Sequence, residues 1–446
     1  MNKPSKPSKA PPTAKLQRSA ISGMALAKAG VKHLGHKARQ LTRDSEEQKE
    51  AQDEHEADLG RILFRALNQL KGTALKVSQM LAMEANFLPA NVRQELAKAC
   101  YQVTPLNRAL VHKLFQQEFG KAPQEIFAEF EGIAFAAASL GQVHHARLHD
   151  GQAVAVKLQY PGIASSIASD MQMLRTLLQS FASRSSLMPD VSVIEHVMQE
   201  AERKLAEEVD YVHEAQQLLW FREHAQMLGI QIPRPILSHS TTSILCMTQL
   251  SGVHVDEWLA SNPSQEQRDH AGQILFDWFI YSSFVLRRVH ADPHPGNFLF
   301  MPDGQIGLLD FGCTKELHPT FCTKISALWC LLKQRDTPGN DAALLQAYLD
   351  LDVLRADLSV DDYRQNIAPA ISEVQDWLIQ PFMSDVFDFA SKSPYPQANK
   401  SHMQAVAKQI RKLDENIMYF DRNYLGIVHM LKRIGARVRT LNPHIC

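Results

Sequence analysis

The hydrophobic positions of the chain recur at helical intervals in several long stretches. From Leu59 they return every three or four residues as far as Leu75, which predicts an amphipathic helix. Asn86-Phe87-Leu88-Pro89 ends this helix. The same spacing predicts further helices over 92–101, 107–119, 191–228 (one long helix or a pair), 325–332, 342–349, 363–379 and 403–438.

Two stretches follow the pattern of strands instead. Residues 135–143 and 153–157 are rich in small and branched apolar side chains, and Asp150-Gly151 between them is typical of a tight hairpin turn. Another strand is expected over 243–250, just before Ser251-Gly252.

Composition indicates an ordinary globular protein. The chain has 446 residues, enough for two or three units, of which 45% are hydrophobic and 21% charged, with a net charge of −1. This near-neutral balance gives no argument for a nucleic-acid partner, and we expect none. The six cysteines lie far apart without a Cys-x-x-Cys pair. That spacing argues against a disulfide framework or a structural zinc site and favours a reducing compartment.

The N-terminal region changes charge along its length. Residues 1–20 are rich in Lys, Pro and Ser and are expected to be disordered. Residues 21–41 interleave apolar and basic side chains, either as a solvated helix that caps the domain, which we favour, or as a segment resting on an anionic membrane surface. Residues 44–58 are acidic, so 1–58 is interpreted as a flexible tail and linker.

No stretch reaches the roughly 20 apolar residues of a membrane-spanning helix. The first residues also lack the apolar run of a secretory signal. We therefore expect a cytoplasmic protein without a transmembrane span, with peripheral attachment to a membrane as the alternative that the basic segment leaves open.

Three oxygen-bearing side chains stand in the order that phosphoryl transfer requires. Asn297 follows Asp292 by five residues, and Asp310 follows Asn297 by thirteen, in the run Asp310-Phe311-Gly312. A carboxylate such as Asp292 can orient or deprotonate an attacking hydroxyl, while Asn297 and Asp310 can hold Mg²⁺ through hard oxygen atoms. The order is that of a kinase catalytic loop followed by a metal-binding Asp-Phe-Gly.

The strand region upstream overlays on a kinase phosphate loop. Its alanines Ala136 and Ala138 stand in place of two loop glycines, whereas Gly141 and Val143 match the kinase pattern. Lys157 closes the next strand, where its ammonium would reach nucleotide phosphates. Alanine resists the positive φ that glycine adopts, so we expect a stiffer loop. The predicted nucleotide-binding residues are Ala136, Ala137, Ala138, Ser139, Gly141, Val143, Lys157 and Met247.

Lys157 needs a carboxylate partner from the helical stretch at 191–228, because an unpaired buried lysine is costly. Glu202 or Glu208 is expected to serve. Asp210 lies two residues after Glu208 and cannot share its helical face, so the helix bends there or one of the two serves another partner.

These motifs together resemble the UbiB (AarF/ADCK-type) family of atypical protein-kinase-like proteins over roughly Leu59 to Asn340. The resemblance extends to Lys76-Val77-Ser78-Gln79, which is similar to the family's Lys-x-Gly-Gln motif with Ser78 in place of glycine. It implies an α+β protein with a two-lobed protein-kinase-like fold. An N-terminal helical extension would cover 59–130, an N-lobe 131–250 and a mostly helical C-lobe 251–446. The extension, with Lys76 and Gln79, would lie over the nucleotide site.

The resemblance also implies a function. Asp292 would be the catalytic carboxylate, Asn297 and Asp310 the Mg²⁺ ligands, and ATP (or ADP) with Mg²⁺ the cofactors. The protein would be an ATPase or a small-molecule or lipid phosphotransferase in ubiquinone or other isoprenoid-lipid metabolism, with an isoprenoid lipid or a biosynthetic enzyme complex as partner.

Two other hypotheses remain. The first is a non-catalytic nucleotide-binding scaffold that organises biosynthetic enzymes. The second is an aminoglycoside- or choline-type kinase, which the alanine-rich loop and the Lys76/Gln79 segment disfavour.

Overall fold

The computed structural model describes residues 106–138, 140–182, 191–335, 337–396, 406, 409–412 and 414–445. The predictions for the tail, for Lys76 and Gln79 and for Ser139 lie outside these residues. The chain divides into two compact units, Met1–Ala215 with Pro235–Thr248 and Gln216–Arg234 with Gln249–Cys446. Both units contain helices and strands, so the α+β class is confirmed.

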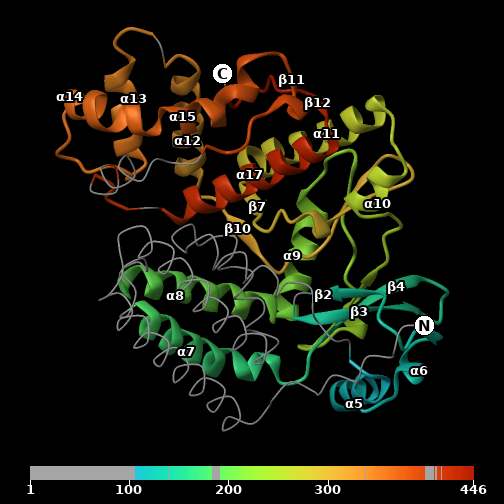
Figure 1. Ribbon diagram of the computed structural model, residues 1–446. Helices are drawn as coiled ribbons and strands as arrows, with labels where there is room; N and C mark the ends of the chain where they lie inside the picture. The colour runs from blue at the N-terminus through green and yellow to red at the C-terminus, as the bar shows by residue number, and fades with distance from the viewer. Residues whose placement is uncertain are drawn as a thin grey trace, which may run out of the picture. The chain divides into compact units, whose positions relative to one another are not determined.

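The first unit is built on an antiparallel sheet (Figure 1). Its strands are β1 (Glu129–Phe130), β2 (Ala136–Ala138), β3 (Gly141–Arg147), β4 (Ala153–Gln159) and β6 (Ile244–Thr248). The order is β1-β3-β4-β6, and β2 also pairs with β3. The predicted hairpin joins β3 to β4, and Gly151 at its turn has φ 88, which favours glycine.

One face of this sheet forms the hydrophobic core of the first unit. Helix α5 (Arg108–Phe119) covers it, and the side chain of Asn107 caps the helix by accepting from the Leu110 N–H. The short helix α6 (Pro123–Ile126) follows. The core combines alternate strand residues with residues of α5: Val111, Leu114, Phe115, Phe127, Ala146, Leu148, Val154, Val156, Leu158, Ile236, Ile244 and Cys246.

Three helices complete the first unit and lead out of it. Helix α7 (Ile163–Ala182) lies beside α8 (Val191–Glu208), and α9 (Tyr211–His224) follows after a break at Val209 and Asp210. The stretch 191–228 is thus a pair of helices, which the sequence left open. The boundary between the two compact units falls within α9, after Ala215.

The described part of the second unit holds three small sheets. Strands β5 (Ile230–Gln231), β8 (Phe298–Phe300) and β9 (Ile306–Leu308) form one, with β9 in the middle. Strand β7 (Arg288–His290) pairs with β10 (Thr314–Glu316), and β11 (Val386–Asp388) pairs with β12 (Arg437–Arg439). Short helical turns η4 (Pro295–Asn297), η6 (Gln380–Met383) and η7 (Phe389–Ser391) connect these elements.

Helices form most of the second unit. They are α10 (Val255–Ala260), α11 (Gln265–Ile280), the π-helical η3 (Tyr281–Val285), α12 (Pro319–Lys333), α13 (Asn340–Asp350), α14 (Val360–Asp362), the π-helical η5 (Tyr363–Ile367), α15 (Ala368–Ile379) and α17 (Glu415–Ile434). Aromatic rings join them, since Trp329 of α12 contacts both Phe420 and Tyr424 of α17 at centroid distances of 5.4 and 5.0 Å.

The predicted helix 403–438 was too long. Helix α17 begins at Glu415, after its N-cap Asp414, and ends at Ile434, before the C-cap Gly435, whose φ of 64 places it in the left-handed region. Residues 437 and 438, which the periodicity assigned to the helix, belong to β12 instead. Figure 1 shows α17 beside α11.

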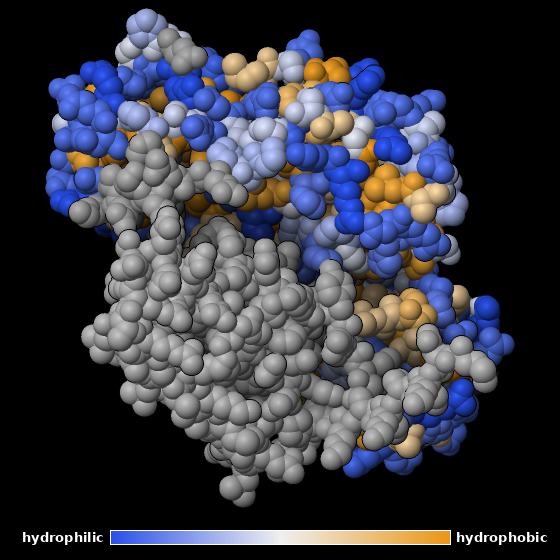
Figure 2. Space-filling model, in the orientation of Figure 1, coloured by the Kyte–Doolittle hydropathy of each residue, from blue (hydrophilic) through white to orange (hydrophobic). Residues whose placement is uncertain are grey.

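No helix among the described residues has the length and apolarity needed to cross a membrane. Hydrophilic residues cover most of the coloured surface in Figure 2, and hydrophobic residues appear there as separate patches. Cys246, Cys313 and Cys322 are buried free thiols. Cys330 is disulfide-bonded, which the wide spacing of the cysteines did not predict.

The second unit buries one lysine deeply. Lys392 is 1% exposed, and its ammonium donates to the Trp377 carbonyl at 2.6 Å and lies 4.0 Å from the centre of the Trp377 ring. Burial, assisted by the charge of Lys432, lowers the pKa of Lys392 from 10.5 to about 7. The unfolded state therefore binds more protons than the folded state between these two values.

This difference gives Lys392 a measurable effect on stability. The free energy of unfolding of the wild type should rise relative to that of Lys392→Met as the pH increases from about 7 to about 10, because the buried amine is neutral there. Urea unfolding of both proteins across this range measures the difference. Parallel pH profiles would contradict the assignment.

Candidate functional site

The face of the first sheet opposite the core carries most of the predicted nucleotide-binding residues. Ala136 pairs with Val143, Val143 with Lys157, and Lys157 with Leu245. Directly paired residues share a face, and side chains alternate along each strand. Ala138, Gly141 and Met247 therefore share the face of Lys157, whereas Ala137 lies on the other face.

Lys157 is held by a buried carboxylate. Its ammonium donates to both carboxylate oxygens of Glu214, at 3.0 and 2.8 Å, and the two side chains are 9% and 1% exposed. The Lys157 ammonium also lies 5.2 Å from the ring centre of Tyr211, one turn before Glu214 on α9. A lysine paired with a helix glutamate is the arrangement that fixes the phosphate-binding lysine in protein kinases.

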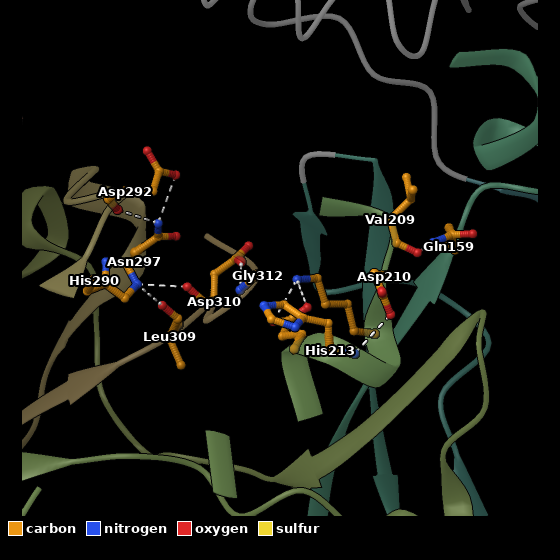
Figure 3. Close-up of polar contacts among 12 residues, drawn as sticks. Gln159, Val209, Asp210, His213, His290, Asp292, Asn297, Leu309, Asp310 and Gly312 are labelled. Carbon is orange, nitrogen blue, oxygen red and sulfur yellow. Dashed lines mark hydrogen bonds and ion pairs between the residues drawn. The ribbon is translucent and has the colours of Figure 1, made fainter. Parts of the chain in front are cut away.

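The predicted partner of Lys157 was therefore wrong, because Glu214 takes the role assigned to Glu202 or Glu208. Glu202 pairs with Arg175 at 3.3 Å. Asp210 caps α9, since its carboxylate accepts from the His213 N–H at 2.9 Å (Figure 3). This cap was the sequence signal that could have located Glu214, because an Asp before a new helix marks its first turn.

The break before α9 is tied to the sheet. The side-chain amide of Gln159, at the end of β4, donates to the Val209 carbonyl at 2.7 Å (Figure 3). On the neighbouring strand, a Cβ at Gly141 would lie 2.2 Å from the Leu158 carbonyl oxygen and 2.9 Å from the Tyr211 hydroxyl. Glycine is thus required at 141 by close packing.

In the second unit, a hairpin brings Asn297 and Asp310 together. Phe298 of β8 pairs with Leu308 of β9, so the residues just before β8 and just after β9 lie at the same end. The Leu309 N–H donates to the Asn297 carbonyl at 2.8 Å. The segment 298–309 that separates Asn297 from Asp310 in the sequence is therefore the hairpin.

The side chain of Asp292 contacts Asn297 and Arg422. The side-chain amide of Asn297 donates to the Asp292 carbonyl at 2.9 Å and to its Oδ2 at 3.2 Å (Figure 3). Arg422 of α17 donates to Oδ1 at 2.9 Å. No signal in the sequence pointed to Arg422, which lies 130 residues from Asp292.

Asp310 has an unusual backbone conformation, with a φ of 58. Asp tolerates this region better than most residues. Its carbonyl and that of Leu309 both approach His290 Nε2, at 2.7 and 3.0 Å (Figure 3). Because carbonyl oxygens only accept, this nitrogen carries the proton. Asp310 Oδ1 accepts from the Gly312 N–H at 3.3 Å.

Phe311 anchors the same turn. It is fully buried, and its ring centre lies 4.9 Å from that of Phe221 on α9 and 5.3 Å from that of His290. The backbone on either side of Asp310 is thus fixed by Gly312 and His290 and by the packing of Phe311. Asp310 itself is half-buried.

The donor set of the second unit fits Mg²⁺. The Asn297 amide nitrogen faces Asp292, so the amide oxygen is the atom that can bind a metal ion, together with the Asp310 carboxylate. Mg²⁺ is typically held by one or two carboxylates plus substrate phosphates, so two protein ligands suffice. No cluster of three or more His, Cys, Asp or Glu side chains suited to a metal occurs among the described residues.

The buried Lys157-Glu214 pair and the Asp292, Asn297 and Asp310 arrangement define a protein-kinase-like molecule. The profile of the ABC1 atypical kinase-like domain matches residues 98–341, which is more than half of the chain. The chain therefore belongs to this family, and the resemblance to UbiB proteins is confirmed.

Several curated relatives carry names of the same family. The chain is 27% identical over 378 residues to the mitochondrial atypical kinase COQ8 of Saccharomyces cerevisiae, with 83% of this chain and 72% of that protein covered. It is 33% identical over 269 residues to the mitochondrial atypical kinase COQ8B of Rattus norvegicus, with 60% and 50% covered. A chloroplastic aarF domain-containing protein kinase of Arabidopsis thaliana is 32% identical over 263 residues, with 58% and 36% covered.

The chain thus spans half or less of the length of two of these relatives. Among solved structures, a Mycobacterium tuberculosis protein in complex with erythromycin matches with a TM-score of 0.59 and 24% identity. The match covers 84% of this chain and 92% of the other. At this identity the likeness supports the kinase-like fold alone.

The pairing of Lys157 with Glu214 predicts a contrast between two glutamates. Glu214→Gln should lower the free energy of unfolding by about 3–5 kcal/mol, because it leaves a buried charge without its partner. Glu202→Gln, which breaks a more exposed pair with Arg175, should cost about 1 kcal/mol or less. Urea unfolding of both variants measures the contrast, and equal losses would refute it.

Proposed function

We propose that the protein binds Mg·ATP and either hydrolyses it or transfers its γ-phosphoryl group to a small-molecule or lipid acceptor. The observation that carries this proposal is the buried Lys157-Glu214 pair. A buried ion pair is weak support for stability, since apolar residues serve as well or better. The presence of this pair on a sheet face is better explained by a charged ligand, whose phosphates Lys157 would bind.

The other residues of that sheet face would contact the nucleotide. Met247, which is 8% exposed, would pack against the adenine base, while Ala136, Ala138 and Val143 would line the phosphate side. Ala136–Ala138 forms a regular strand paired with β3, which supports a phosphate loop stiffer than a glycine-rich one.

The second unit would supply the chemistry of transfer. Asp292 would orient the attacking hydroxyl or water and accept its proton, and Asn297 and Asp310 would hold Mg²⁺. The bound metal ion would neutralise charge on the phosphates. Since phosphoryl transfer needs little covalent help from the protein, correct positioning of these three side chains is the main requirement.

The acceptor is proposed to be small or a lipid because the chain leaves little room for a peptide platform. Only Cys313 separates Gly312 from β10, and α12 begins at Pro319. Long activation segments that bind protein substrates therefore have no counterpart between 312 and 319. By family resemblance, the acceptor or pathway belongs to ubiquinone or other isoprenoid-lipid metabolism, with a membrane surface or a biosynthetic complex as partner.

A non-catalytic nucleotide-binding scaffold is the second candidate. The Arg422 contact is compatible with it, because a carboxylate bound by a guanidinium can hold the loop in place without taking part in transfer. The rate of ATP turnover distinguishes the scaffold from the enzyme.

The deciding experiment is Mg²⁺-dependent phosphate release from ATP. Asp292→Asn and Asp310→Asn should each lower release by about 100-fold or more, because positioning and charge at the reacting atoms are lost. Asn tolerates positive φ as Asp does, so Asp310→Asn should preserve the turn. Release is measured with and without anionic liposomes, and stimulation by liposomes would support a lipid acceptor or partner.

Asp303→Asn is the matched control for these variants. Asp303 lies at the far end of the same β8–β9 hairpin, where its carboxylate accepts from the Gln305 N–H at 3.1 Å. Its activity should equal that of the wild type. If wild type and Asp292→Asn bind ATP and release phosphate at the same rate, the scaffold replaces the enzyme.

A further inference from the structure

Helix α17, near the C-terminus, lies along the loop that carries Asp292 and the segment that follows Asp310-Phe311-Gly312. Its contacting residues Glu415, Tyr419, Arg422 and Gly426 are spaced by four, three and four positions. Residues at this spacing share one face of a helix. The contacts described below therefore belong to a single docked surface.

The first turns of this surface bind the segment after Gly312. Glu415 pairs with Lys315 of β10 at 2.7 Å, and the Lys315 ammonium lies 5.5 Å from the ring centre of Tyr419. The side chain of Asn416 accepts from the His318 N–H at 3.3 Å, at the start of α12. These contacts fix the beginning of α17 next to β10.

The middle of the surface reaches Asp292. Arg422 Nη2 lies 2.9 Å from Asp292 Oδ1, and the two side chains are 29% and 27% exposed. Asn297 holds the other oxygen, Oδ2, at 3.2 Å. Because the two carboxylate oxygens are bound by donors from different elements, rotation of the carboxylate plane is restricted.

One turn further along, α17 touches the loop itself. A Cβ at Gly426 would lie 2.2 Å from Pro293 Cγ and 3.1 Å from the Pro293 carbonyl oxygen. Only glycine permits the helix backbone to come so close to the residue that follows Asp292. This close approach is an observation independent of the ion pair, and it sets the distance over which Arg422 must reach.

We propose that Arg422 is a positioning residue that fixes the Asp292 carboxylate in the orientation for the attacking hydroxyl or water. The proposal rests on the proposed function and extends it to α17. A guanidinium suits this task because it is planar and permanently charged, so it orients the carboxylate without exchanging protons with it. Misplacement of a catalytic group by about 1 Å can cost 100-fold in rate.

Four variants of the full-length chain test this role. Arg422→Met removes the charge and hydrogen bonds but keeps apolar bulk, and Arg422→Lys keeps the charge without the planar fork. Gly426→Ala pushes α17 away from Pro293 without touching any charge. Arg433→Met is the control, because Arg433 also belongs to α17 but pairs with Asp256 of α10 instead of Asp292.

Each variant is assayed for phosphate release from Mg·ATP and for ATP binding, alongside wild type and Asp292→Asn. Arg422→Met should lower kcat by about 10- to 100-fold with unchanged KM and Kd for ATP, since the acceptor side is disturbed and the nucleotide face is not. Arg422→Lys should recover part of the loss. Gly426→Ala should lower kcat in the same way, and Arg433→Met should match the wild type.

The other outcomes separate the two proposals. If wild type exceeds Asp292→Asn but Arg422→Met equals or exceeds wild type, Arg422 does not position the carboxylate, while the proposed function stands. Equal losses in Arg422→Met and Arg433→Met would reduce the effect to general packing of α17 and overturn the inference. If wild type releases no more phosphate than Asp292→Asn, the proposed function fails and the role of Arg422 fails with it.

Discussion

Burying a lysine ammonium costs much free energy unless a carboxylate accompanies it. Several elements of the first unit together bring the carboxylate of Glu214 to Lys157. The strand alternation that fills the core with Val156 and Leu158 necessarily turns Lys157 to the opposite face. Glu214 reaches it only because α9 begins anew after the break at Val209 and Asp210. The break in the helix is thus part of the site.

In the second unit, the main constraint is that Asn297 and Asp310, which are far apart in the sequence, lie close together. The β8–β9 hairpin brings Asn297 to the same end as Asp310, and the pairing of β7 with β10 closes the loop around both. Phe311 and His290 then fix the turn at Asp310 from the buried side. These contacts act together with a buried base, since Val289, Phe298 and Leu308 are at most 2% exposed.

Helix α17 shows how a distant segment can take part in such a loop. It is held by an aromatic cluster with Trp329 and by the glycine contact at Pro293, so its placement depends on packing along its whole length. The surroundings of the Asp292 carboxylate therefore depend on a helix that lies 130 residues further along the chain.

The sequence alone determined the strand hairpin, several helices and the kinase-like motifs, because these follow from local periodicity and from residues close together in the chain. The motifs in turn indicated the family and its α+β fold, whereas helices α7 and α11 were not predicted. The sequence also identified Lys157, Asp292, Asn297 and Asp310 as candidate site residues. Only the tertiary structure decided that Glu214 rather than Glu202 or Glu208 meets Lys157, that α17 starts at Glu415, and that Arg422 binds Asp292. The Asp210 cap marks the restart of the helix locally. The contacts of Glu214 with Lys157 across 57 residues and of Arg422 with Asp292 across 130 residues depend on how distant elements pack, which no local pattern encodes.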